Sequence, residues 1–446
     1  MNRGSVICPI VILAVLAGTS TFFFMFQYND IAPSKQSEPC YLRSVETGGG
    51  KVLNEIEPGS EAYYALSSTK KRLIEETNAV NEELQASILM STKDSGSSGT
   101  ITRALMGYLP PGEAKFTSEL KWFYLSIGYM RVSQPPHIKT DLIIFTEPSF
   151  VDHIVSELNC LRDIRTSASN PEACIVLPHV RLKNRDVRPG NVKPPLTEYS
   201  NYVDSMLILA EFPSDSIYDY ILRSDLDTFL TPGFSNWTLP DDILIATGAG
   251  GYGSENVNRH LSWTMREKLK LKDQGLIGLG STWYGRSSIM INAAKLTIAC
   301  MNWLHTQEFN EYEQFHAGVD GWPYWHWPVL LLYGGHIALN QIPVSKILRS
   351  TEGVMELDKG TASAAAMTHA TKHLHCYHSE DFFSKFQFQA LKYANRDITE
   401  YTSMNSTQSY AGVIAISSQR LSSQALATYV ADTSSMERGD WKRLRP

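Results

Sequence analysis

The chain has 446 residues, of which 43% are apolar and 19% are charged, and its formal net charge is −6. This composition is typical of a folded protein with a substantial core, and it argues against long disordered regions. The mildly acidic balance argues against a dedicated nucleic-acid-binding protein, and six cysteines are too few for a disulfide-dense scaffold.

The N-terminus carries an uncharged, mainly apolar run over residues 6–26, and Arg3 precedes it. As a helix this run spans roughly 32 Å, enough to cross a hydrocarbon core of about 30 Å. The positive-inside rule then predicts a cytoplasmic tail (1–5), a transmembrane signal-anchor (6–26) and a lumenal remainder, which is a single-pass type II topology. A signal peptide cleaved near Gly18 is the alternative, but the apolar run continues to Phe26.

Two further features agree with a lumenal location. Asn236 and Asn405 begin glycosylation sequons, and Cys160 and Cys174 are close enough in sequence to close a short loop. Five cysteines follow the apolar run, so at least one of them is free or pairs between chains, and Cys40 is the candidate.

Residues 27–99 are predicted to form a lumenal stem, because flexible Gly- and Ser-rich segments occur at 47–50 and 95–99. Between these segments, four apolar residues recur at near-heptad spacing: Leu66, Leu73, Val80 and Leu84. This spacing indicates a short helix, which is either a homodimer contact or an ordinary amphipathic helix.

From residue 100 onward, predicted strands and helices alternate. The strands are expected at 101–109, 141–145, 173–177, 219–222 and 242–246, and the helices at 113–132, 150–161, 199–212 and 287–304. This order predicts an α/β domain with a mixed, mostly parallel sheet flanked by helices, whose ligands bind at the carboxyl ends of the strands. We expect the catalytic domain to cover 100–400 and a polar C-terminal tail to cover 401–446.

The most informative segment is an apolar strand that runs directly into Asp225-Leu226-Asp227. Two carboxylates just beyond a strand can hold a hard divalent cation, and that cation can bridge a diphosphate and stabilise the charge of a departing nucleotide. The alternative is that Asp225 and Asp227 cap the turn after the strand.

This segment resembles the Asp-x-Asp element of glycosyltransferases with the nucleotide-diphospho-sugar-transferase (GT-A-like) fold, and the anchor, stem and lumenal domain resemble the architecture of Golgi members of that group. The resemblance covers about 100–392 and looks most like an uncharacterised eukaryotic family of such transferases. It implies a nucleotide-sugar donor, Mn²⁺ or Mg²⁺, a glycan or glycoprotein acceptor, and residence in the Golgi membrane. It also implies that Asp225 and Arg223 lie near the nucleotide, and that Asp225 and Asp227 bind the metal.

Haloacid-dehalogenase-like phosphatases share the strand-then-Asp-x-Asp pattern, with the first aspartate as nucleophile. Their pattern requires Thr or Val two residues after the second aspartate, where this chain has Phe229. Their motif also follows the first strand, whereas at least three predicted strands precede this one. A non-catalytic lumenal glycan-binding or scaffolding protein with the transferase fold is a further alternative.

A histidine-rich segment at 369–378 is a second source of metal ligands, because transferases of this fold often complete the metal shell with a late histidine. His375 is the first candidate and His378 the second, and His373 shares a face with His375 if the segment is a strand. A mixture of core and surface histidines is the alternative, and a zinc site that includes Cys376 has ligand spacing too tight for an ordinary structural site.

The acceptor side is predicted at 318–328, where Asp320 is followed by closely spaced Trp and Tyr residues that can stack on sugar rings. Asp320 is a candidate general base for an inverting reaction, or else a helix cap. A glycine-rich stretch at 247–253 is predicted to be an active-site loop, because glycine allows a close approach of the backbone to a ligand. We further expect Asp227 to be exposed, so that its replacement leaves the fold largely intact.

Overall fold

The computed structural model describes residues 61–91, 99–164, 172–185, 196, 200–213, 218–250, 253–309, 326, 329–361, 365–376, 383–393 and 404–431. The chain divides into two units, 1–57 and 58–446, and every described residue belongs to the second unit. The predicted tail and anchor, and Cys40, therefore lie outside the described residues. Among the described helices, none is both long enough and apolar enough to cross a membrane.

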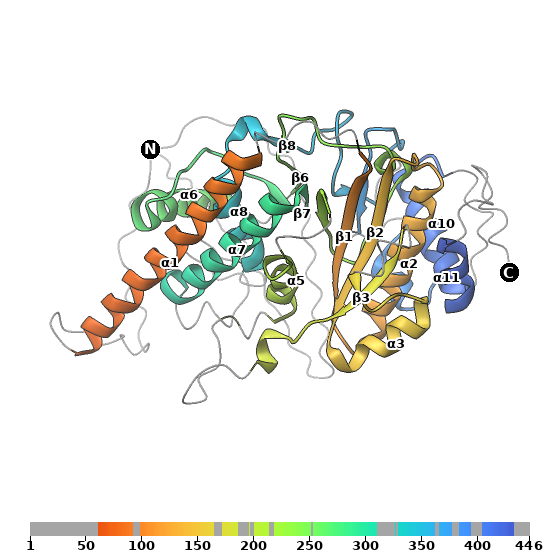
Figure 1. Ribbon diagram of the computed structural model, residues 1–446, viewed down its shortest axis with the longest axis horizontal. Helices are drawn as coiled ribbons and strands as arrows, with labels where there is room; N and C mark the ends of the chain where they lie inside the picture. Colours follow the sequence, from red (N-terminus) through yellow and green to blue (C-terminus); the bar gives the residue numbers. More distant parts are fainter. Residues whose placement is uncertain are drawn as a thin grey trace, which may run out of the picture. The chain divides into compact units, whose positions relative to one another are not determined.

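A seven-stranded mixed sheet forms the centre of this unit, in the order β3-β2-β1-β4-β7-β6-β8 (Figure 1). Its strands are β1 (Ile101–Leu109), β2 (Ile138–Thr146), β3 (Cys174–Pro178), β4 (Tyr220–Arg223), β6 (Ile245–Ala249), β7 (Leu279–Arg286) and β8 (Ile347–Arg349). Strands β3, β2, β1 and β4 are parallel, β6 is parallel to β8, and β7 is antiparallel to both β4 and β6. The prediction of a mixed, mostly parallel α/β sheet is confirmed.

A smaller sheet lies beyond the end of β4. It has the order β5-β10-β9, formed by β5 (Thr228–Leu230), β10 (His373–His375) and β9 (Lys359–Gly360). Strand β10 is antiparallel to β5 and parallel to β9. The small sheet therefore brings residues near 360 and 375 next to the segment that directly follows β4.

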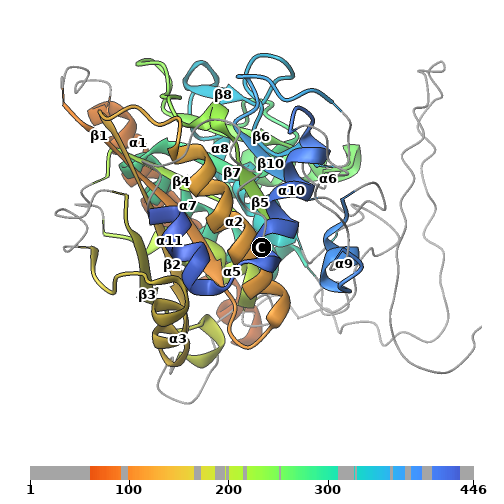
Figure 2. The ribbon, with the colours of Figure 1, turned by 90° about the vertical axis from the view of Figure 1, so that its right-hand side faces the viewer.

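Helices cover both faces of the large sheet (Figure 1, Figure 2). Alternate residues of β1 point to opposite faces, with Ala104 and Met106 in one core cluster and Leu105 and Leu109 in the other. The first cluster includes residues of α1 (Glu61–Ser91), α5 (Ser200–Ala210), α6 (Glu255–Trp263), α7 (Ser287–Trp303) and α8 (Leu330–Leu339). The second includes residues of α2 (Ala114–Arg131), α3 (Pro148–Leu158), α9 (Lys385–Gln389), α10 (Thr407–Arg420) and α11 (Ser423–Ala431).

Short helical turns complete the described elements. Three are 3₁₀ turns, η1 (Leu182–Asn184), η3 (Pro232–Phe234) and η7 (Val344–Lys346), and two are π-helical turns, η4 (Thr264–Leu269) and η5 (Leu304–Glu308). The π-helical turns continue α6 and α7.

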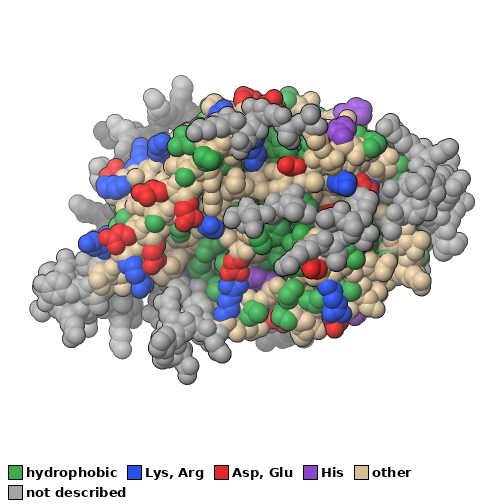
Figure 3. Space-filling view, in the orientation of Figure 1, with side chains coloured by type: hydrophobic (Ala, Val, Ile, Leu, Met, Phe, Trp, Pro, Cys, Tyr) green, Lys and Arg blue, Asp and Glu red, His purple; other side chains and the backbone are tan. Residues whose placement is uncertain are grey.

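Helix α1 lies within the predicted stem, but it packs against helix α7 of the α/β domain. Leu73 and Leu84 are buried in the first core cluster, and Asn292 of α7 donates a hydrogen bond to the Ser87 hydroxyl (2.6 Å). Packing within the chain therefore accounts for the burial of Leu73 and Leu84, two of the four residues at near-heptad spacing. Lys, Arg, Asp and Glu side chains mix on the face that carries α1 (Figure 3), and Lys71 pairs with Glu75.

Residues 404–431 differ from the predicted polar tail. Helices α10 and α11 pack on α2, and Tyr410 donates a hydrogen bond to the Leu230 carbonyl (2.7 Å). The serine content of α10 suggested exposure, but Ser418 donates its hydroxyl to the Ala415 carbonyl of the same helix (2.8 Å). A hydroxyl that bonds to its own helix needs no water, so a serine-rich helix can be buried.

A disulfide joins Cys160 to Cys174, as their short separation predicted, and ties the end of α3 to the start of β3. The strand predicted at 242–246 begins later than expected. Asp241 and Asp242 form a turn, in which Ile243 donates its N–H to the Pro240 carbonyl (2.9 Å), and β6 starts only at Ile245.

Candidate metal and nucleotide site

The two aspartates lie at the point where the strand order of the large sheet reverses. The chain builds the sheet outward from β1 to β2 and β3, and then places β4 on the other side of β1. In open α/β sheets such a switch point leaves a crevice at the carboxyl ends of the strands, where ligands bind. Asp225 and Asp227 follow the carboxyl end of β4, while Leu226 between them is buried. Burial of Leu226 therefore directs the two flanking side chains away from the core.

Asp225, Asp227 and His375 are brought together by the fold. One ligand atom of each lies within 4.8 Å of the others, and all three side chains are half-buried. His375 reaches the aspartates because β10 pairs with β5, where it lies opposite Thr228, the residue after Asp227. Carboxylate oxygens suit Mg²⁺ and Mn²⁺, and an imidazole nitrogen is a usual ligand of transition metals such as Mn²⁺. The donor set thus fits a divalent cation, and metal binding itself stays a prediction.

Arg223 lies behind Asp225 and not at an open surface. Its side chain is 1% exposed, and its guanidinium donates to Asp225 Oδ1 (2.9 Å), to the Ser281 carbonyl (2.6 Å) and to the Ser205 hydroxyl (2.8 Å). A buried guanidinium with these partners fixes the orientation of Asp225. The predicted contact between Arg223 and a nucleotide stays a prediction.

The hydrogen bonds of Asp225 do not support the interpretation that it caps the turn. The Asp225 carboxylate accepts hydrogen bonds from Arg223 and from the Ser281 hydroxyl (3.0 Å), and both donors are side chains. The hydroxyl groups of Ser224 (2.9 Å) and Thr228 (2.7 Å) bond to the Asp225 carbonyl and hold the turn. The carboxylates of the pair are therefore not needed to cap this turn.

Asp227 is less exposed than expected and has a cationic neighbour that the sequence analysis missed. Its side chain is 13% exposed, and Lys385 of α9 lies 2.5 Å from Oδ2, while His375 Nε2 lies 3.4 Å from Oδ1. Burial alone would raise the pKa of Asp227, but His375 and Lys385 outweigh it and hold that pKa well below its ordinary value. Asp227 is thus ionised, as a metal ligand must be.

Residues 97–442 match the family model of a domain of unknown function (DUF7164). The chain belongs to this family. The matched span contains Asp225, Asp227 and His375, and it ends after α11, so it includes the helices that replace the predicted tail. Helix α1 precedes the matched span. No curated protein matches the chain.

Several solved structures resemble the DUF7164 domain weakly, and those named here are glycosyltransferases. Galactosyltransferase LgtC in complex with donor and acceptor sugar analogs has 10% identity and a TM-score of 0.35, covering 76% of this chain and 99% of that chain. Mouse xyloside xylosyltransferase 1, apo form, has 14% identity and a TM-score of 0.28, covering 54% and 84%. Glycosyltransferase GlyE of Streptococcus pneumoniae TIGR4 has 10% identity and a TM-score of 0.26, covering 56% and 45%. These scores are too low to transfer a residue role.

An aromatic cluster connects the acidic turn to α9 in the DUF7164 domain. Trp122 of α2 donates its indole N–H to the Leu226 carbonyl (3.0 Å), between the two aspartates. Its ring stacks on Phe229 (5.5 Å between centroids) and meets Phe383 and Phe388 edge-on. Phe383 and Phe388 flank Lys385 in the sequence, so the cluster positions both the turn and the lysine.

Glu119 is a second acidic group close to Lys385. It is buried on α2, and its carboxyl accepts a hydrogen bond from Gln389 of α9 (2.9 Å). Burial, with a further contribution from the charge of Asp227, raises the pKa of Glu119 to about 8. The group is therefore mostly protonated at neutral pH, which limits negative charge beside the candidate metal site.

The histidines of β10 have different surroundings. The prediction that His373 and His375 share one face of a strand is confirmed, yet His373 is fully buried and its Nε2 lies 2.9 Å from the Ser224 hydroxyl. Cys376 is a buried free thiol. Because His373 is buried against Ser224, it is a poor candidate ligand for the alternative zinc site. His378 lies outside the described residues.

The remaining predicted positions are only partly described. Asp320 and most of 318–328 lie outside the described residues, so the general base and the aromatic acceptor surface stay predictions. Of the glycine-rich stretch, 251–252 are also outside. Gly248 is described, and what approaches it closely is the carboxylate of Asp358, not an open ligand site.

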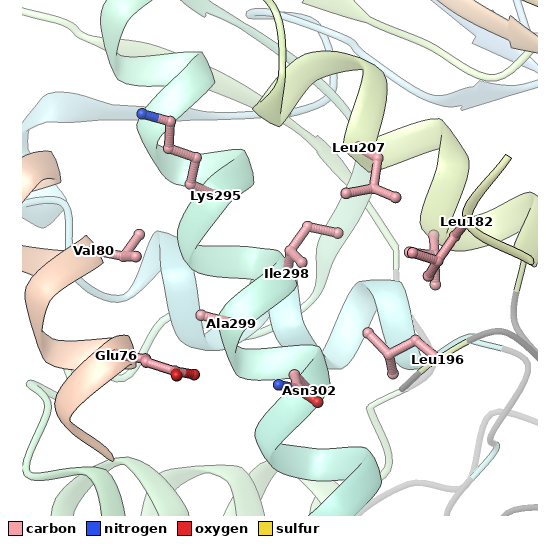
Figure 4. A pocket seen from close by; sticks show the side chains of 10 residues that line it. Glu76, Val80, Leu182, Leu196, Leu207, Lys295, Ile298, Ala299 and Asn302 are labelled. Atoms are coloured by element: carbon pink, nitrogen blue, oxygen red, sulfur yellow. The ribbon is translucent and has the colours of Figure 1, made fainter. Parts of the chain in front are cut away.

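A cavity of about 330 Å³ lies away from this site, between α1, η1, α5 and α7 (Figure 4). Its lining is mainly apolar, with Glu76, Lys295 and Asn302 as polar members. None of the candidate site residues lines it. Nothing in its lining indicates which molecule would bind there.

Proposed function

We propose that this chain is a glycosyltransferase that uses a divalent cation, Mn²⁺ or Mg²⁺, to transfer a sugar from a nucleotide-sugar donor to a glycan or glycoprotein acceptor. The observation that supports this most strongly is the meeting of Asp225, Asp227 and His375 at the carboxyl end of β4, beside the switch point of the sheet. Their spacing and chemistry match a site for a cation that carries a diphosphate.

The charges around the site fit a negatively charged ligand. A divalent cation held there would offset the negative charge of a departing nucleoside diphosphate. Lys385 contributes an ammonium group whose pKa, lowered by burial but raised more by Asp227, lies above its ordinary value, so it stays cationic. Protonated Glu119 adds no opposing charge. The chain's own groups thus favour binding of a diphosphate next to Asp225 and Asp227.

The phosphatase alternative is disfavoured by the position of the acidic pair in the chain. Asp225 and Asp227 follow β4, whereas the phosphatase motif follows the first strand. Phe229 also fills, with a buried ring, the position where the phosphatase pattern has Thr or Val.

The nucleotide site is tested by thermal unfolding of the full-length protein with a panel of nucleoside diphosphates. With Mn²⁺ present, the matching nucleotide should stabilise the protein by RT ln(1 + [L]/Kd), about 2.7 kcal/mol at a hundredfold excess over Kd. In EDTA the stabilisation should be lost. Equal stabilisation in both buffers would contradict a metal-bridged site. Metal-dependent binding without hydrolysis or transfer of any nucleotide-sugar would favour the non-catalytic alternative.

We also propose that the protein is a single-pass type II protein of the Golgi membrane, anchored by residues 6–26. The Cys160–Cys174 disulfide supports an oxidising compartment, and the side chains of Asn236 and Asn405 are exposed, as glycosylated asparagines must be. A homodimer through the stem or Cys40 remains part of this proposal.

Expression of the full-length chain in a eukaryotic cell tests this location. Glycosidase treatment should lower the mass of the protein, and Asn236→Gln should remove one glycan. An intact N-terminal peptide should be recovered from the membrane fraction. A mature N-terminus near Gly18 would show that residues 6–26 include a cleaved signal peptide and not an anchor. A protein that carries a glycan at neither sequon would contradict the lumenal location.

A further inference from the structure

Asp358 is a buried carboxylate directly behind His375. Its side chain is 1% exposed, and its backbone φ of 57° lies in the left-handed region that residues other than glycine rarely adopt. A buried ionised group needs partners. Thr282 of β7 supplies two, because its backbone N–H donates to Oδ2 (3.1 Å) and its hydroxyl donates to Oδ1 (2.5 Å).

Two glycines of the large sheet leave room for this carboxylate. A Cβ on Gly248 of β6 would lie 1.9 Å from Asp358 Oδ2, and a Cβ on Gly280 of β7 would lie 2.5 Å from the same oxygen. A side chain at either position would force the carboxylate out. A strained backbone and a buried charge persist only where the surroundings determine them, which points to a role for Asp358.

The Asp358 carboxylate faces both histidines of β10. Its Oδ1 lies 3.3 Å from His375 Nδ1 and 3.4 Å from His373 Nδ1. The other ring nitrogen of His375, Nε2, faces Asp227 at 3.4 Å. An imidazole that binds a metal through Nε2 keeps its proton on Nδ1 and donates it to an acceptor, often a carboxylate.

We propose that Asp358 is a positioning residue for the metal site: it accepts the Nδ1 proton of His375, so that the Nε2 lone pair points at the cation held with Asp225 and Asp227. This inference rests on the proposed function, because it assumes that a divalent cation binds there. It assigns a role to a residue on the loop before β9, 131 positions after Asp227 in the chain.

Replacement by asparagine should reverse the hydrogen bond to His375. The N–H of Thr282 requires an acceptor at the Oδ2 position, so the amide oxygen should take that position and the NH₂ group should take the Oδ1 position. The NH₂ group then donates toward His375 Nδ1, which must accept. The ring proton therefore moves to Nε2, the nitrogen that should bind the metal.

The test compares Mn²⁺ binding by the full-length wild type, Asp358→Asn and a matched control, Glu356→Gln, by calorimetry with the metal alone. Glu356 is a buried carboxylate two residues away that pairs with Lys359 (2.8 Å) and accepts from the Gly353 N–H (3.0 Å). Both variants should lose stability, but only Asp358→Asn should weaken Mn²⁺ binding, by roughly 10–100-fold. Electron spin echo spectra of bound Mn²⁺ should show imidazole nitrogen in wild type and in Glu356→Gln, and lose it in Asp358→Asn.

The outcomes are separable. Unchanged Mn²⁺ affinity and an unchanged nitrogen signal in Asp358→Asn would overturn the role of Asp358 while leaving the metal site intact. Absence of Mn²⁺ binding by the wild type would overturn the proposed site itself, and this inference with it. If Asp358→Asn does not fold, Thr282→Val decides, because it removes one donor that orients the carboxylate: weaker Mn²⁺ binding supports the proposal, and wild-type affinity overturns it.

Discussion

Replacing Asp227 by asparagine should weaken Mn²⁺ binding by at least about a hundredfold, because loss of a partner that merely orients a metal ligand already costs roughly 10–100-fold. Asparagine keeps the size and shape of the side chain but removes one negative charge from the donor set of Asp225, Asp227 and His375. Turnover of a nucleotide-sugar should fall with metal occupancy. Calorimetry with Mn²⁺ and an assay of donor hydrolysis measure the two effects.

The same substitution should also affect stability, contrary to the expectation from sequence. Asp227 is 13% exposed and pairs with Lys385, which is 14% exposed, so Asp227→Asn leaves a partly buried ammonium group without its carboxylate. A cost on the order of 1–3 kcal/mol follows. Asp242→Asn is the matched control, because it makes the same chemical change on an exposed turn and should alter neither property. Wild-type Mn²⁺ affinity in Asp227→Asn would refute the metal site.

Trp122→Ala should destabilise the protein by about 3–5 kcal/mol, the usual range for deletion of a buried aromatic side chain. The indole is fully buried between Phe229, Phe383 and Phe388, so its removal leaves a cavity under the acidic turn and under α9. It also removes the hydrogen bond to the Leu226 carbonyl. Equilibrium unfolding in urea measures the loss of stability, and Mn²⁺ affinity should fall with it.

Two comparisons sharpen this prediction. Trp122→Phe keeps an aromatic ring but lacks the N–H donor, so it should cost less than Trp122→Ala while still leaving the Leu226 carbonyl without its partner. Trp263→Ala removes the same atoms from a ring that is 45% exposed, and should cost clearly less. A similar loss of stability in Trp122→Ala and Trp263→Ala would contradict the prediction that the buried aromatic cluster stabilises the acidic turn.

Local patterns predicted most of the parallel half of the sheet. The apolar runs that became β1, β2, β3 and β4 are short, bounded by turn residues and separated by helical segments, so their order alone indicates a parallel sheet. Strand β7 was not predicted, because Gly280 and Gly285 interrupt its apolar pattern. It exists because β4 and β6 pair with it on both sides, which a local pattern cannot reveal.

The burial of polar side chains could not be inferred from the local sequence. Arg103 lies within an otherwise apolar strand and is fully buried, because its guanidinium donates to the carbonyls of Phe234 (2.9 Å) and Ser235 (3.0 Å), which lie over 130 residues away. Arg223 is buried for the same reason, because its guanidinium donates to the Ser281 carbonyl, 58 residues away. Whether such a side chain finds a partner depends on segments that are distant in sequence, so its exposure cannot be inferred from its neighbours in sequence.

The sequence by itself determined the α/β fold and the position of the acidic pair, because strand periodicity and an Asp-x-Asp directly after a strand are local features. It also singled out His375. Only the tertiary structure decided which groups meet there. Lys385 reaches Asp227 through the packing of α9 on Trp122, and Asp358 reaches His375 through the register of β9, β10 and β5. These two contacts join residues 158 and 17 positions apart, and they depend on helix packing and strand register, whereas the sequence pattern extends over only a few residues.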